Sequence, residues 1–368
     1  MSTTYRSTLL ELLRTRQRAA QPVFTADISY WISGRQEAGT ADPAWASEPG
    51  YLKLHRDLKV MPYYFYADFW AGTPVYDATV RVEVEQKGHA SAQSWHTPAG
   101  DLRMEQEYLP ASCSTACTRY PVQTAADLRV FRYLIEHRRL ELAPAVHHYA
   151  ARTAAWAEFD GLPSLALPRS PLPAFCYEWA GVEQAVYLLM DHEDELREIF
   201  ALMEAQEQPV VAGLATLKPP LVHFPDNLSS ETLTGLYDNW LRPTHQRRLA
   251  ALHAAGVAAA VHLDGTVAGL LPKLAAAGFD AVEALTPQPV GDVTVADMRR
   301  LANRNDLILW GGLPGAMFAP PFTWPDMQRH LEQLLTAWDG IPFIIGVADQ
   351  VPPDGDISFC RRIADMLT

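Results

Sequence analysis

The chain has 368 residues, 48% of them hydrophobic and 20% charged, so it can bury a large core and lacks the composition of a disordered or fibrous protein. Its formal net charge is -13, which argues against nucleic acid or an anionic membrane as a partner. The four cysteines show no repeated spacing, which favours a reducing compartment over a disulfide framework.

Residues 1–18 mix charged side chains with single apolar ones, so they lack the apolar stretch of a signal peptide and predict a short amphipathic helix. No later window reaches the roughly 20 apolar residues that a bilayer requires. We therefore expect a soluble, cytoplasmic protein.

The first half of the chain is irregular after an expected opening strand at residues 22–30. Apolar and polar residues alternate at 75–86 and 90–107, which is typical of antiparallel hairpins. We expect these hairpins to form a small added sheet, within an N-terminal elaboration at about residues 60–120. The other expected elements are helices at 124–139 and 143–158, a proline-rich strand and loop at 162–173, and helices at 182–190 and 193–208.

In the second half, short apolar runs alternate with longer segments that carry apolar residues at helical spacing. The runs lie at 221–224, 258–263, 281–285, 307–310 and 343–347, and the helical segments at 229–255, 267–277, 295–303 and 324–338. Such runs are typical of parallel strands that are covered on both faces. The alternation predicts a parallel α/β fold, and the absence of a flexible linker or internal repeat predicts one domain over residues 1–368.

Polar residues close several of the apolar runs, where the carboxyl ends of parallel strands carry function. These residues are Asp226 and Asn227 after the first run, His262 and Asp264 at the second, Glu283 within the third, the Gly311-Gly312 turn after Trp310, and Asp349 after the last. Because they close separate strands of one sheet, we expect them to meet in one pocket.

His262 and Asp264 stand two residues apart on one strand, so their side chains share a face. This pair suits acid–base chemistry or two ligands of a divalent metal, and the alternative is a core histidine bonded to a helix-capping carboxylate. Glu283 lies in an apolar strand and needs a metal, a substrate or a buried arginine to offset its desolvation. For Asp226 and Asp349, helix capping is the ordinary interpretation.

Aromatic residues provide weaker candidates for substrate contact. Asp27, Tyr30 and Trp31 lie at the end of the first expected strand, and Trp310 closes a later one, so all four are expected at the same mouth. Aromatic packing is the alternative for the first three. The aromatic residues of segment 63–70 could stack on a flat ligand, cover the barrel bottom or form a homodimer contact.

Several stretches in one order carry a family resemblance. They are Pro225-Asp226-Asn227 before a long helix, His262-Leu263-Asp264-Gly265 at a strand end, residues 277–283, residues 309–312 and Val351-Pro352-Pro353. In these stretches the chain resembles the uroporphyrinogen decarboxylase superfamily, which includes methyltransferases that act on cobalamin and on thiols such as coenzyme M. The resemblance implies a (β/α)8 TIM barrel. Residues 286–292 make the chain most similar to uncharacterised members.

The chain departs from both characterised branches of the superfamily. In the methyltransferase branch two cysteines and a histidine bind zinc that activates a thiol, and Asp264 and Asp349 occupy the places of those cysteines. A set of His262 and two aspartates is harder than a thiolate site, so it suits zinc or a harder divalent ion, or no metal at all. The arginine-rich segment of the decarboxylase branch is replaced by residues 24–31, which contain no arginine.

Three functional hypotheses follow. In the first, the chain transfers a methyl group between a small-molecule donor and a corrinoid, free or on a corrinoid protein, or another acceptor. His262, Asp264 and Asp349 would act as ligands or as an acid–base pair, while Glu283 and the Asp226-Asn227 pair orient the substrate.

The second hypothesis is a cofactor-free decarboxylase, a lyase acting on a porphyrinogen or another carboxylate. It requires basic residues at the mouth, for which Arg35, Arg56 and Arg103 are the candidates. The third is a catalytically inactive barrel that binds a ligand. The expected buried carboxylates argue against it, because keeping buried charges without a function costs stability.

Overall fold

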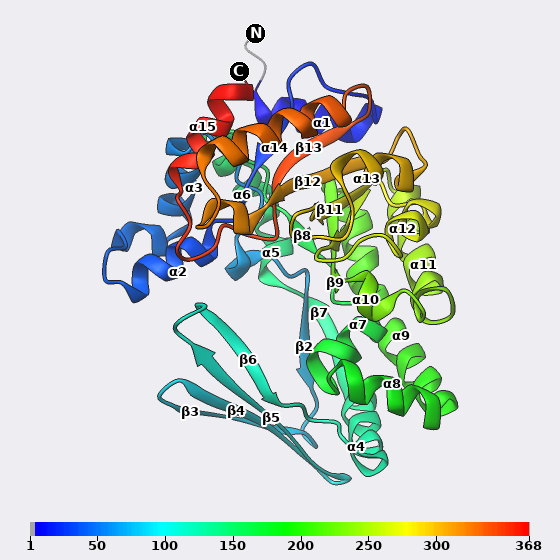
Figure 1. The fold of residues 1–368 in the computed structure, drawn as a ribbon. Helices are drawn as coiled ribbons and strands as arrows, with labels where there is room; N and C mark the ends of the chain where they lie inside the picture. Colours follow the sequence, from blue (N-terminus) through cyan, green and yellow to red (C-terminus); the bar gives the residue numbers. More distant parts are fainter. Residues whose placement is uncertain (1–3, 368) are drawn as a thin grey trace.

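The computed structural model describes residues 4–367, and its centre is a curled parallel sheet of seven strands (Figure 1). The order across the sheet is β1-β13-β12-β11-β10-β9-β8, and every neighbouring pair is parallel. The strands are β1 Val23–Thr25, β8 Leu165–Ala166, β9 Leu221–Leu228, β10 Ala258–Leu263, β11 Ala281–Leu285, β12 Ile308–Pro314 and β13 Phe343–Ala348. The fold class is therefore α/β and similar to a TIM barrel.

An irregular segment, residues 61–71, lies where an eighth strand would close the barrel. At one end Met61 forms a parallel bridge with Thr25 of β1, and at the other Trp70 forms one with Ala166 of β8. We call residues 61–71 the closing segment. The expected eight regular strands are thus corrected to seven strands and this segment within the described residues.

The closing segment is irregular in backbone and turns the side chains of Tyr63, Tyr64 and Phe69 into the barrel. Pro62 lacks a ladder N–H, and a short 3-10 turn, η2 Tyr66–Asp68, interrupts the extended backbone. The ring of Tyr63 packs 5.0 Å from that of Trp310 on the far strand β12. The segment therefore fills part of the barrel interior. It contributes Met61, Tyr63, Tyr64 and Phe69, which pack with Ala260, Ile308, Trp310 and Ile344 of the strands.

Helices cover the sheet as in other βα repeats, and capping residues fix several of their ends. Thr323 and Asp326 form a reciprocal capping box at the start of α14, and Gly278 ends α12 in the left-handed region. The helices are α1 Tyr5–Thr15, α2 Ser29–Glu37, α3 Glu48–Asp57, α4 Ala125–Glu136, α5 Pro144–His147, α6 Tyr149–Ala157, α7 Pro171–Ala174, α8 Val182–Asp191, α9 Glu193–Leu217, α10 Ser230–Leu233, α11 Arg242–Ala254, α12 Leu271–Ala277, α13 Val295–Ala302, α14 Trp324–Ala337 and α15 Ser358–Leu367.

Short turns complete these elements: η1 Pro43–Ala46, η3 Phe175–Trp179, η4 Tyr237–Leu241 and η5 Gly315–Phe318. Two of them, η3 and η4, are single π-helical turns that run directly into or out of an α-helix. Among residues 4–367, no helix combines the length and the apolar character needed to cross a membrane.

Two antiparallel sheets lie outside the barrel sheet. The strand β2 Gly72–Tyr76 directly follows the closing segment in the chain and pairs with β7 Arg138–Leu142. A four-stranded sheet joins β3 Arg81–Lys87, β4 Ala90–Thr97, β5 Gly100–Leu109 and β6 Ser114–Arg119 in that order. In Figure 1 it projects away from the barrel sheet, and β4 and β5 contact α4.

Three elements run further than, or differ from, the pattern of the sequence. The helix expected at 124–139 ends at Glu136, and the last residues of that range begin β7. The strand β9 continues past 224 to Leu228, and α9 continues through Pro209 to Leu217. Proline hid the two extensions, and the charged residues of β7 hid the early end of the helix, because proline is a poor indicator of a strand or a helix interior and charged residues are a poor indicator of a strand.

The expected turn at Gly311 and Gly312 is instead part of β12. Both glycines have positive φ, 134° and 90°, so the strand continues through conformations that other residues rarely adopt. A side chain on Gly311 would lie 2.6 Å from the backbone nitrogen of Leu285 in β11. The glycines therefore serve the close approach of two strands.

Candidate active site

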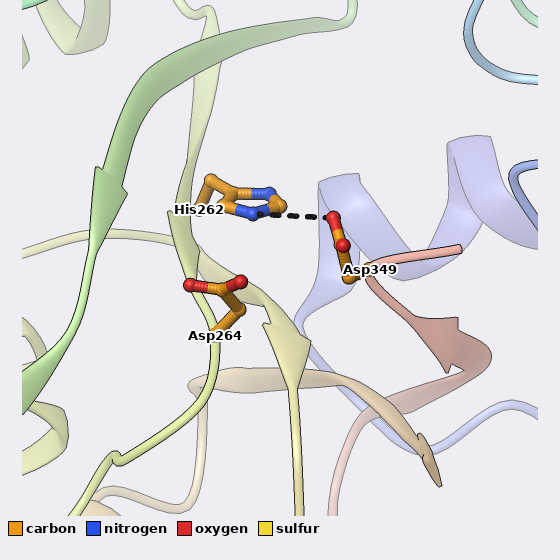
Figure 2. A group of neighbouring side chains, drawn as sticks. All are labelled: His262, Asp264 and Asp349. Carbon is orange, nitrogen blue, oxygen red and sulfur yellow. Dashed lines mark ion pairs between the residues drawn. The ribbon is translucent and has the colours of Figure 1, made fainter. Parts of the chain in front are cut away.

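Three of the expected residues come together at the carboxyl ends of β10 and β13. His262 lies near the end of β10 and Asp264 follows it, while Asp349 follows β13, three strands away in the sheet. One ligand atom from each lies within 4.8 Å of the others, and His262 Nε2 is 4.0 Å from Asp349 Oδ1 (Figure 2). We call these three residues the cluster.

Glu283 orients the imidazole of the cluster. The parallel register of β10 and β11 places it beside His262, and its Oε2 lies 2.7 Å from Nδ1. The Tyr63 hydroxyl donates to the other carboxylate oxygen at 3.2 Å. Because the buried carboxylate accepts a hydrogen bond from Nδ1–H, Nε2 faces the two aspartates, where it can bind a metal ion after losing its own proton.

Backbone conformation at the rim also sets the site apart. Asp349 has φ of 62° and Asn227 has φ of 52°, both in the left-handed region. Asn and Asp tolerate this region better than most residues, but strained positions of this kind concentrate at functional sites. The two side chains line the same cavity.

The charge of His262 depends on the acids around it. Burial alone would lower its pKa, but the Glu283 carboxylate, with smaller contributions from Asp264 and Asp349, raises that pKa to about 9. The same ion pair keeps the pKa of Glu283 below its usual value despite full burial. In the absence of another cation, this imidazole therefore holds a proton at neutral pH.

The pKa values of the two aspartates are raised, unlike that of Glu283. Withdrawal from bulk solvent, followed by the neighbouring carboxylates, raises the pKa of Asp349 to about 6 although its side chain is half exposed to the cavity. Burial likewise raises the pKa of Asp264. Three carboxylates thus share one imidazole, and this excess of negative charge favours a bound cation.

A cavity of about 160 Å³ lies over the cluster. Its aromatic wall comes from the closing segment, and its other side from strand ends and loops. The lining residues are Tyr64, Tyr66, Phe69, Trp70, Arg169, His223, Pro225, Asn227, His262, Asp349 and Gln350. No cysteine of the described chain is among them, so the cavity offers no thiolate nucleophile.

His223 is a second histidine in this cavity, and it is held neutral. Full burial lowers its pKa to about 4. Its Nδ1 lies 3.2 Å from the Tyr64 hydroxyl and its Nε2 lies 3.1 Å from the Ser164 hydroxyl. Hydroxyl groups can donate or accept, so both ring nitrogens are satisfied without a charge.

Asp27 and Tyr30 lie behind the cavity wall. The Tyr66 hydroxyl, which lines the cavity, donates to Asp27 Oδ2 at 2.7 Å, and burial raises the pKa of Asp27. The pKa of Tyr30 is raised by burial and then by Asp349. Both residues therefore act on the site through a neighbour and neither lines it.

Three other expected site residues are placed elsewhere. The Asp226 carboxylate is fully buried and accepts from the amide and hydroxyl of Ser170 and from His245, which makes it a structural anchor for the start of α7. Trp310 is buried in the barrel and donates to the Thr25 hydroxyl at 2.8 Å. Trp31 donates to the Gly355 carbonyl at 3.1 Å and is likewise outside the cavity.

The basic residues expected for a decarboxylase are also absent from the cavity. Arg35 donates to the Pro353 carbonyl, Arg56 lies over the Phe159 ring, and Arg103 pairs with glutamates on the four-stranded sheet.

His223, Arg169 and Gln350 line the cavity but were not expected from the sequence. His223 lies within an apolar strand run, the same signal that marked His262, and could have been found in that way. Arg169 follows the short strand β8, and only the fold shows that it reaches the cavity.

We compared the chain with known proteins. No family model matches it, and no curated protein matches it by sequence. Among solved structures, a methyltransferase from Methanosarcina mazei aligns over 99% of both chains with a TM-score of 0.58 and 12% identity. The two proteins share one fold. This likeness fits the resemblance of the sequence to the uroporphyrinogen decarboxylase superfamily.

B12-independent methionine synthases give weaker alignments. The enzyme from Shewanella sp. W3-18-1 covers 72% of this chain and 74% of its own, with a TM-score of 0.44 and 11% identity. The putative enzyme from Listeria monocytogenes covers 95% and 96%, with a TM-score of 0.41 and 9% identity. Both scores are too low to indicate a common fold by themselves.

Proposed function

We propose that this chain is a methyl-transfer enzyme with a divalent-metal centre formed by His262, Asp264 and Asp349. The observation that carries the proposal is the mutual approach of three ligand atoms within 4.8 Å, with the imidazole already oriented by Glu283. The fold shared with a methyltransferase supports methyl transfer as the reaction.

The donor set fits an oxygen-preferring ion or zinc. One imidazole nitrogen and two carboxylates bind such ions, and no lysine or arginine among residues 4–367 forms an ion pair with any of the three. When bound, the metal would act as a Lewis acid on the heteroatom of the methyl donor. The open side of the cluster faces the cavity, where a small-molecule substrate can enter.

The protein residues provide orientation and exclusion of water. In methyl transfer the bond between carbon and donor heteroatom breaks with its electron pair left on the heteroatom, while the acceptor supplies the pair for the new bond. Tyr64, Tyr66 and Phe69 surround this point and exclude competing water. Asn227 offers an amide for orienting the substrate, and the acceptor is a corrinoid, free or protein-bound, or another nucleophile.

A metal-binding measurement tests the centre. The purified protein is treated with a chelator and titrated with Co²⁺, whose absorption spectrum reports the ligand set, and Zn²⁺ and Mn²⁺ are then tested by competition. We expect one ion per chain, and an affinity at least tenfold lower in Asp264→Ala and Asp349→Ala. Asp339→Ala, an exposed aspartate that pairs with Arg18, is the control and should bind as the parent protein does.

The reaction is tested by following cob(I)alamin as it converts to methylcobalamin in the presence of methylated amines, thioethers or methoxyarenes. We expect turnover with one donor class and its loss in both cluster variants. If the parent protein binds no metal and methylates no acceptor, the proposal is wrong and an inactive ligand-binding barrel is the better description.

A further inference from the structure

A second, larger cavity adjoins the cavity of the cluster. Its volume is about 470 Å³, and it shares Trp70 and Arg169 with the smaller one. It lies between the paired strands β2 and β7 and the helices α5, α7 and α9. The volume is within the range of about 300–1,000 Å³ that holds small organic ligands.

Arg138 on β7 is the unusual residue of this cavity. Its Nε donates to Gln206 at 3.0 Å, and within residues 4–367 its two terminal nitrogens make no hydrogen bond or ion pair. The side chain is half-buried, and burial holds its pKa below the usual range. Glu207 and Glu178 of the cavity wall interact with the Arg138 guanidinium through space, but its terminal nitrogens keep hydrogen-bonding capacity that a bound anion would use.

Three of the other four charged residues on the wall form ion pairs, and Asp68 is the fourth. Arg169 donates to Glu178 at 2.8 Å, and Glu207 pairs with the buried Arg248. Arg138 therefore offers both terminal nitrogens to a ligand, whereas Arg169 already uses one terminal nitrogen for Glu178 and has a buried Nε without a hydrogen-bond partner. The planar pair of terminal nitrogens of Arg138 matches the geometry of a carboxylate.

The remaining wall is largely apolar and flat. Trp70 is 37% exposed, and Trp179 is held by the ring of Trp95 at a centroid distance of 5.1 Å. Leu140 and Met203 add apolar surface. Two indole rings with one unpaired guanidinium are features that recognise a flat ring bearing an anionic group.

We propose that the second cavity binds a flat aromatic monocarboxylate, with its carboxylate on Arg138 and its ring against Trp70 and Trp179. A single charge is favoured because Asp68 and Glu178 also line the cavity and would repel a polyanion. The end of the ligand at Trp70 borders the cluster cavity. If the proposed function holds, this ligand is one of the two partners in methyl transfer.

The test measures binding of 1-naphthoate, by calorimetry, to the chelator-treated protein. We expect binding of 1-naphthoate and at least tenfold weaker binding of 1-naphthamide, which has the same rings without the charge. Arg138→Gln should weaken naphthoate binding at least tenfold. The control is Arg139→Gln, because this neighbour on the same strand is exposed and pairs with Glu141; its affinity should be unchanged.

Arg138→Lys provides a second variant if Arg138→Gln does not fold. It keeps the charge but loses the two-nitrogen fork, so we expect it to bind naphthoate several-fold more weakly. No binding of naphthoate to the parent protein, equal binding of the amide, or equal binding by the folded Arg138 variants overturns the proposal. Because the protein is metal-free, these outcomes do not depend on whether the cluster binds metal or transfers methyl groups.

Discussion

At the scale of single residues, Glu283 has the largest influence on the candidate site. It is 1% exposed, and its hydrogen bond to Nδ1 decides which nitrogen of His262 faces the aspartates. We predict that Glu283→Gln lowers the affinity for Co²⁺ by about 10–100-fold, since the neutral amide orients the ring but no longer raises its basicity.

The matched variant for that prediction is Tyr63→Phe. It removes only the hydrogen bond that the Tyr63 hydroxyl donates to Glu283 and keeps the carboxylate. We expect its loss of Co²⁺ affinity to be less than tenfold. A Glu283→Gln protein with the parent affinity would show that the carboxylate has a purely structural role.

Asp226 illustrates a buried carboxylate with the opposite role. Its oxygens accept hydrogen bonds from Ser170 and His245, and no part of it reaches the cavity. We predict that Asp226→Asn lowers the free energy of unfolding by about 3 kcal/mol, because it breaks a buried hydrogen-bonded pair. Urea titration measures this loss, and metal affinity should stay unchanged. Weaker metal binding without a loss of stability would contradict the structural role.

His55 makes stability depend on pH. It is fully buried in α3, and burial lowers its pKa from 6.5 to about 4. Below pH 6.5 the unfolded chain binds the proton that the folded protein excludes, so stability is full above that pH and falls as the pH drops toward 4. We predict that this residue accounts for about 3 kcal/mol of the acid loss.

The measurement compares urea unfolding at pH 7 and pH 4 for the parent protein and His55→Gln. The variant is expected to be less stable at neutral pH but to lose less on acidification. His147→Gln, at an exposed position, controls for the removal of a surface imidazole. Equal acid loss in the parent protein and His55→Gln would refute the prediction.

At the scale of elements, β12 depends on two glycines within its length. We predict that Gly311→Ala costs about 3 kcal/mol of stability, because its methyl group would meet the backbone of β11 at 2.6 Å in a strained conformation. Gly278→Ala is the control: it has φ of 105° but nothing within 4 Å, so only strain of about 1 kcal/mol is expected. Equal losses in urea unfolding would show that crowding at Gly311 is relieved.

Elements with a clean hydrophobic pattern could be predicted from the sequence. The expected runs at 258–263 and 281–285 have the bounds of β10 and β11. The closing segment could not be predicted as a barrel wall, because its contacts are with residues distant in sequence. Likewise β7 reads Arg-Arg-Leu-Glu-Leu, a charged pattern that gains its strand conformation only by pairing with β2.

At the scale of the whole molecule, the cluster joins β10 to β13 across two intervening strands. An ion bound there would tie these distant parts of the chain together in the folded state alone. We predict that Co²⁺ at about 100 times its dissociation constant raises the free energy of unfolding by about 3 kcal/mol. Asp349→Ala should abolish this gain in urea titrations, and a gain that persists in the variant would place the ion elsewhere.

The candidate site was predictable where strand ends converge. His262, Asp264 and Asp349 could be grouped because parallel strands present their carboxyl ends on one side. Trp310 and Asp226 met the same criterion but point into the barrel and toward α7. Successive side chains of a strand point to opposite faces of the sheet, so a shift of one residue decides whether a side chain points into the barrel or away from it.

The shared wall between the two cavities has a thermodynamic consequence. Trp70 and Arg169 contact both chambers, so any occupant that shifts these side chains on one side alters the affinity on the other. Such coupling is reciprocal: the first ligand changes the binding free energy of the second by the same amount as the second changes that of the first. Either ligand can then bind first, depending on the two ligand concentrations. An unreactive analogue bound in one cavity would change the apparent affinity of the other cavity for its ligand.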